Sequence, residues 1–113
     1  MSKKSNHLYE GMYILSATLS EDARNKALDK ITSGITERKG EVRKVFDQGR
    51  RKLASEINGR REGYYYILYF TFPATHMKEL WREYQLNEDL LRFMTLATEN
   101  VPEKLEFKAL QPA

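Results

Sequence analysis

The sequence predicts an α+β domain in which one four-stranded antiparallel sheet carries two helices on the same face. Four stretches are rich in aromatic and β-branched residues and end at turn or polar residues, as strands do. Two other stretches repeat apolar residues every three or four positions, as amphipathic helices do. The order is strand, helix, strand, strand, helix, strand, which with right-handed crossovers gives the βαββαβ, ferredoxin-like arrangement.

The first strand and helix are expected in residues 8–39. Residues 8–15 (LYEGMYIL) are apolar and aromatic, which predicts a strand. Ser20 is a good helix cap, with two acidic residues in the first turn. Gly40 stands where a left-handed C-cap belongs. The apolar face of this helix is made of Ala23, Ala27, Leu28, Ile31 and Ile35.

The middle of the chain predicts two long strands. Residues 41–57 alternate loosely and contain Gly49, where we expect a bend or bulge. Residues 58–63 begin with Asn-Gly and are polar, which predicts a turn that opens a longer loop. Residues 64–72 (YYYILYFTF) are the most strand-like stretch, and Pro73 ends it.

The second helix and last strand complete the pattern. Thr75 is expected to cap a helix with the apolar stripe Met77, Leu80, Trp81 and Tyr84, and residues 90–97 (LLRFMTLA) predict a strand. We expect residues 1–98 to form one domain. Residues 99–113 are polar and contain two prolines, so we expect a tail that is flexible in the free protein.

Composition excludes several classes of protein. A chain of 113 residues suits a single core, and the absence of Cys excludes disulfide scaffolds and thiolate sites. No apolar run is long enough to span a bilayer, so we expect a cytosolic protein. His7 and His76 lack further ligands at metal spacing, and no glycine-rich phosphate loop occurs. We expect neither enzyme activity nor a metal, a cofactor or a small-molecule substrate.

Positive charge is concentrated in one quarter of the chain. Residues 38–62 hold nine basic and four acidic residues, a net charge of +5, within a chain whose net charge is +3. One basic segment on a near-neutral body is typical of polyanion binding, although a solvated charged surface is the alternative. At period two, Arg50 and Lys52 point to one face of their strand and Arg51 to the other. The rival explanation is an edge strand charged against aggregation.

The sheet is expected to leave one face uncovered by the domain. Neither face of residues 64–72 is polar, which favours a surface that meets a partner, although tyrosine hydroxyls facing water would also fit. Residues 62–69 (EGYYYILY) match the RNA-recognition signature in part. One alternative function is therefore a stand-alone single-stranded RNA-binding module that stacks bases on Tyr64 and Tyr66. A small-molecule regulatory module or a purely protein-binding module is another.

The chain resembles the bacterial small-subunit ribosomal protein S6 family from about Tyr9 to Leu96. No single motif carries the resemblance, which rests on the order and spacing of several. These are Tyr9-Glu10, Gly40-Glu41-Val42, Gly49-Arg50-Arg51-Lys52-Leu53-Ala54, Gly63-Tyr64-Tyr65, Pro73 and Leu90-Leu91-Arg92-Phe93-Met94. The family commonly has Tyr-Pro where this chain has Ser55 and Glu56, and a cation is common where Leu96-Ala97 stand.

The resemblance implies a non-enzymatic protein that binds the central domain of small-subunit rRNA together with ribosomal protein S18 during platform assembly. It implies rRNA contacts at Tyr9, Arg50, Arg51, Lys52 and Arg92, to which charge alone adds Lys3 and Lys4. It also implies a partner protein beside the sheet, for which Tyr64, Tyr66 and Phe93 are the expected contacts.

Overall fold

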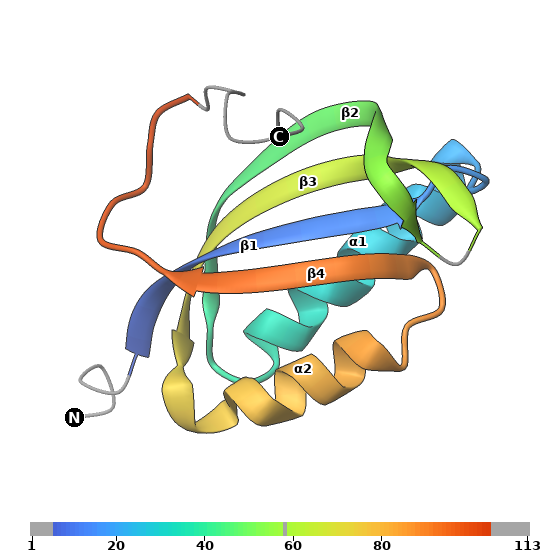
Figure 1. Ribbon diagram of the computed structural model, residues 1–113. Helices are drawn as coiled ribbons and strands as arrows, with labels where there is room; N and C mark the ends of the chain where they lie inside the picture. Colours follow the sequence, from blue (N-terminus) through green and yellow to red (C-terminus); the bar gives the residue numbers. More distant parts are fainter. Residues whose placement is uncertain (1–5, 58, 105–113) are drawn as a thin grey trace.

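The computed structural model describes residues 6–57 and 59–104, and its elements follow the predicted order. They are β1 (Asn6–Ser16), α1 (Glu21–Thr36), β2 (Glu41–Ile57), β3 (Arg60–Pro73), the 3₁₀ turn η2 (Ala74–His76), α2 (Met77–Gln85) and β4 (Leu90–Ala97). The sheet order is β2-β3-β1-β4, and each neighbouring pair is antiparallel. Both helices lie on one side of the sheet (Figure 1). The ferredoxin-like prediction is confirmed.

The start of α1 is as predicted, but its end differs. Ser20 Oγ accepts a hydrogen bond from Ala23 N at 3.2 Å, which satisfies a free amide of the first turn. The left-handed residue after the helix is Lys39, with φ 70°, so the cap expected at Gly40 is wrong. Gly40 is needed for a different reason. A Cβ there would stand 2.7 Å from Ile35 Cγ2, Phe72 Cδ1 and the Thr71 carbonyl oxygen, because the chain enters β2 in close contact with the core.

β2 and β3 form a hairpin that is longer than predicted. The turn predicted at Asn-Gly is confirmed at Gly59, a turn residue with a φ of +78°, while Asn58 lies outside the described residues. The longer loop expected through Gly63 is wrong, because β3 already begins at Arg60 and pairing continues through Lys52–Glu62 to Ile57–Arg60. Arg60, Arg61 and Glu62 can be polar because no core lies beneath this end of the hairpin, where their side chains reach solvent. The bulge predicted at Gly49 is confirmed by a register shift after Asp47 and a φ of +79°.

The second helix begins without the predicted cap. Ala74–His76 form the 3₁₀ turn, and no side chain caps either that turn or α2, so the expectation for Thr75 is wrong. The apolar stripe is confirmed in part, because Met77, Leu80 and Tyr84 are buried while Trp81 is exposed. β4 has the predicted bounds.

A hydrogen bond between two tyrosines joins the sheet to α2 inside the core. Tyr13 and Tyr84 are buried, their hydroxyl oxygens are 3.0 Å apart, and their rings meet edge to face. We expect Tyr84→Phe to lower the free energy of unfolding by about 1–3 kcal/mol, because it leaves the Tyr13 hydroxyl buried without a partner. The double variant Tyr13→Phe/Tyr84→Phe should cost less than the single one. Urea denaturation measures both, and a double variant that costs as much as two single ones would contradict the argument.

Alkaline pH should weaken the fold through the same pair. Burial raises the pKa of both Tyr13 and Tyr84 above the ordinary value of about 10. Their contribution to stability is therefore complete below pH 10 and is lost as the pH rises above it, by about 1.4 kcal/mol per pH unit for each tyrosine. Denaturation between pH 8 and 11 tests this, and the double Phe variant should lose less stability over that interval than the unchanged protein.

Candidate nucleic-acid interface

Strand register separates the cations of β2 between the two faces of the sheet. The helices cover one face of the sheet, and we call the other the open face (Figure 1). Arg51 pairs with Gly63, which lies on the open face together with Tyr65. Arg50 pairs with Tyr64 and Lys52 with Glu62, on the side of the helices. The prediction that Arg50 and Lys52 point opposite to Arg51 is confirmed. The hairpin therefore presents positive charge on both of its sides.

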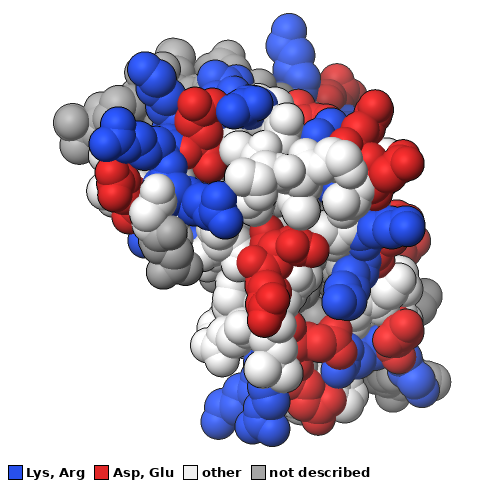
Figure 2. Space-filling model, turned by 90° about the vertical axis from the view of Figure 1, so that its right-hand side faces the viewer, with Lys and Arg blue, Asp and Glu red and all other residues white. Residues whose placement is uncertain are grey.

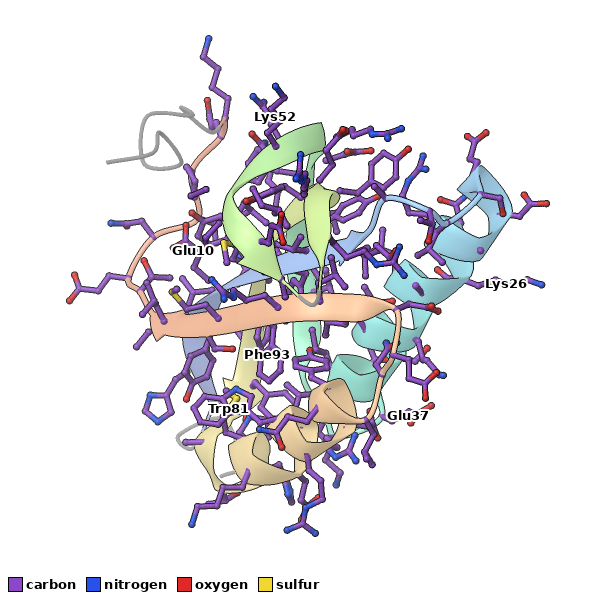
Figure 3. All side chains as sticks on the ribbon, turned by 45° about the vertical axis from the view of Figure 1, so that its right-hand side comes forward. Glu10, Lys26, Glu37, Lys52, Trp81 and Phe93 are labelled. Atoms are coloured by element: carbon purple, nitrogen blue, oxygen red, sulfur yellow. The ribbon has the colours of Figure 1, made fainter. Side chains whose placement is uncertain are left out.

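Basic side chains gather over the hairpin. Figure 2 looks onto the end of the molecule that carries it, and Lys and Arg side chains cover its upper left part with acidic side chains between them. Lys52 lies at the top of the hairpin in Figure 3 and is exposed. Arg43, Arg60 and Arg61 are exposed on the same two strands. This is the largest concentration of cations within residues 6–57 and 59–104.

Two acidic residues partly neutralise this surface. Arg50 Nε donates to Glu62 Oε1 at 2.6 Å, and Arg61 Nε donates to Glu56 Oε2 at 3.1 Å. The Glu62 contact raises the pKa of Arg50, which stays cationic. Exposed ion pairs contribute little to stability, so these arginines can exchange a carboxylate for a phosphate at small cost. Arg51 Nε is bound differently, to the Gln48 carbonyl oxygen at 3.0 Å.

Arg92 lies on the open face, at the end of the sheet that carries the hairpin. It is exposed on β4 opposite Ile14, which in turn pairs with Tyr65 on β3. Three strand spacings separate β4 from β2, so the backbones of Arg92 and Arg51 are roughly 15 Å apart. That span is short enough for one stretch of nucleic acid to contact both.

The structure does not bring Tyr9 to this surface. Tyr9 lies on the helix side near the opposite end of β1, where its ring centroid is 5.8 Å from that of Phe70. Leu15, beside the hairpin, is six positions further along β1, about 20 Å along the strand. Lys3 and Lys4 lie outside the described residues.

The three aromatic residues expected to contact a partner lie on the helix side of the sheet. Tyr66 is 3% exposed, and Tyr64 packs partly against the core. Phe93 points from β4 toward α2 (Figure 3), with its ring 5.2 Å from that of Tyr84. Base stacking on the open face by Tyr64 and Tyr66 is therefore wrong, while contact of Tyr64, Tyr66 and Phe93 with a partner protein stays a prediction. Both alternating sets in β3 are apolar, so alternation alone did not show which one the helices cover.

The open face carries other apolar residues, which the sequence reading did not select. Met94 is 49% and Leu96 53% exposed on β4, beside the partly buried Met12 of β1. Near them the Tyr69 hydroxyl donates to Glu10, and burial, together with this contact, raises the pKa of Tyr69. The mixed pattern of β4 was the available signal, because a solvated edge strand would carry polar residues on its outer face.

The segment after β4 returns across the end of the sheet. Figure 1 shows it leaving β4 and reaching the level of β2. There Lys44 Nζ donates to the Glu103 carbonyl oxygen at 2.8 Å. This hydrogen bond connects the segment to β2, and residues 105–113 lie outside the described part. The flexibility expected for the whole tail stays a prediction.

Other kinds of site find no support in the described ranges. Within residues 6–57 and 59–104, no group of three or more His, Asp or Glu side chains could hold a metal ion. In the same ranges, no helix is both long and apolar enough to cross a membrane. Within the described residues, the charged hairpin and the exposed apolar part of the open face are two candidate binding surfaces.

Comparison with known proteins gives consistent matches. The family model "Ribosomal protein S6" matches residues 8–97. The "Small ribosomal subunit protein bS6" of Protochlamydia amoebophila (strain UWE25) is 62% identical over 110 residues, covering 97% of this chain and 96% of its own. That of Chlamydia muridarum is 64% identical, covering 97% and 98%. The crystal structure of 30S ribosomal protein S6 from Thermotoga maritima superposes with a TM-score of 0.78 at 31% identity, over 82% of this chain and 88% of the other.

Proposed function

The chain belongs to the ribosomal protein S6 family, and on that premise we propose that it binds the central domain of small-subunit rRNA together with ribosomal protein S18. Membership alone makes it a structural, non-enzymatic component of the small ribosomal subunit in the bacterial cytoplasm. The finer assignment of RNA domain, partner and contact residues is the proposal, and it includes a role in assembly of the platform.

The placement of Arg51 and Arg92 is the observation that carries the rRNA contact. Both lie at the hairpin end of the open face, and Arg50 and Lys52 extend the positive charge around the same two strands. Cations held by phosphates release condensed counterions, so such a surface binds RNA through its backbone and with strong salt dependence. Contacts of this kind position the protein on a folded RNA without reading base edges.

The exposed apolar part of the open face supports the partner protein. Met94 and Leu96 are side chains that water solvates poorly, and they lie beside Met12 in the ladder. An apolar centre with polar residues around it is typical of a protein–protein interface. We therefore place S18 over Met12, Met94 and Leu96, with rRNA at the hairpin end.

Sedimentation of a cell lysate tests the proposal. The chain should migrate with small subunits at moderate salt and be released at high salt, since phosphate contacts weaken as salt rises. Immunoblotting across the gradient measures both. A chain that stays at the top of the gradient under every condition would contradict the ribosomal assignment of these surfaces.

A further inference from the structure

A second group of cations lies around the side of the hairpin that faces the helices. Here the first turns of α1 approach β2 and β3 (Figure 1). The Arg24 guanidinium carbon lies 4.1 Å from the centroid of the Tyr64 ring, and Arg24 Nε donates to the Tyr66 hydroxyl at 3.1 Å. Stacking and the hydrogen bond together fix the plane and direction of this guanidinium.

Arg50 lies against the same tyrosine. It faces Tyr64 directly across the β2–β3 ladder, and its side chain is 54% exposed. Like Arg24, it is held through Nε, in this case by Glu62. Among the described residues, the terminal nitrogens of Arg24 make no hydrogen bond, so a rigidly placed pair of donors is available to a ligand.

Two acidic residues lie near Arg24, Arg50 and Tyr64, which together we call the helix-side corner, and they limit what this corner can bind. Asp47 and Glu62 balance the two arginines, so the corner attracts no anion over long range. Asp47 Oδ1, however, accepts from Gly49 N at 2.8 Å and closes the bulge, while Glu62 engages Nε of Arg50. The other cations of the hairpin therefore attract a phosphate over long range, and the corner contributes guanidinium groups of fixed orientation. A planar donor pair suits the oxygens of a phosphate.

A purely structural role explains the arrangement less well. An exposed cation–π contact contributes about 0.5–1 kcal/mol, and an apolar side chain could cover Tyr64 at least as effectively. We propose that Arg24 and Arg50, held against Tyr64, bind a backbone phosphate of the rRNA on the helix side of the hairpin. This inference rests on the proposed rRNA binding, and it means that RNA passes around the β2 edge instead of contacting the open face alone.

Substitutions at Arg24 test it in the full chain with S18 and a central-domain rRNA fragment. Arg24→Met keeps a long side chain over Tyr64 and removes the charge. It should weaken binding roughly fivefold near 0.15 M salt and lower the salt slope by about one. Arg24→Lys should restore the slope but only part of the affinity. Lys26→Met is the matched control, because Lys26 is exposed and extends from α1 away from the hairpin (Figure 3). It should bind as the unchanged chain does.

The outcomes separate this inference from the function on which it rests. If the unchanged chain binds with steep salt dependence and Arg24→Met equals Lys26→Met, rRNA binding stands and the phosphate site is wrong. If Arg24→Met lowers the affinity and the melting temperature together while the salt slope stays the same, Arg24 only supports the fold and the inference is overturned. If the unchanged chain shows no salt-dependent binding at all, both proposals fail.

Discussion

Replacing Arg50, Arg51 and Lys52 together by alanine should weaken binding to small-subunit rRNA roughly 100-fold near 0.15 M salt. Each phosphate contact contributes a factor of about five at that concentration through counterion release, and three are removed. The slope of log affinity against log salt should fall by about 2.5. Titration of labelled rRNA with the full chain and S18, at four salt concentrations, measures both quantities.

A matched variant separates local contact from general charge. Lys30, Lys78 and Arg82 are exposed on the helices, and their replacement by alanine changes the net charge by the same amount. This variant should keep most of the affinity. Equal losses in the two variants would mean that net charge alone attracts RNA, and the hairpin would lose its special role. Both variants should unfold at nearly the same urea concentration as the unchanged chain, since all six side chains are at the surface apart from the partly exposed Arg51.

The sequence was a good guide where one physical signal dominates. The cap at Ser20 and the bulge at Gly49 were correct because each depends on local chemistry within a few residues. It was a poor guide where polarity has two explanations. Residues 60–62 are polar and form a strand, because this end of the hairpin extends beyond the core and its side chains reach solvent. Gly40 signalled a left-handed turn, whereas its real constraint is a close contact with Phe72 across the fold.

The candidate site shows the same division. The cluster of cations in β2 could be found because charge and strand period are both properties of the sequence. Which side chains of β3 lie on the open face could not be found from the sequence. Tyr64 and Tyr65 are equally apolar, and only the packing of the helices decides which one is covered. Arg24 was missed for a related reason. Forty residues separate it from Tyr64, and nothing short of the tertiary fold brings the two together.

Introducing a charge at the exposed apolar part of the open face should abolish binding of S18. Met94→Asp and Leu96→Asp each place a carboxylate where we expect a dry contact. An unpaired buried charge costs at least about 3 kcal/mol, which corresponds to a loss of more than 100-fold in affinity. Because both side chains are about half exposed in the free chain, neither change should lower its stability by more than a few tenths of a kcal/mol. Calorimetric titration of the full chain with S18 measures the loss.

Leu86 provides the control for this prediction, because it is a 76% exposed leucine at the end of α2, on the helix side of the molecule. Leu86→Asp makes the same chemical change and should leave S18 binding intact. Should Leu86→Asp abolish binding while Met94→Asp does not, the partner would dock on the helices and the open face would be left to rRNA. The two surfaces are also expected to act together. If S18 and the hairpin arginines contact the same folded rRNA, Met94→Asp should weaken rRNA binding only when S18 is present. The reason is that coupling between the two surfaces requires both ligands, S18 and rRNA.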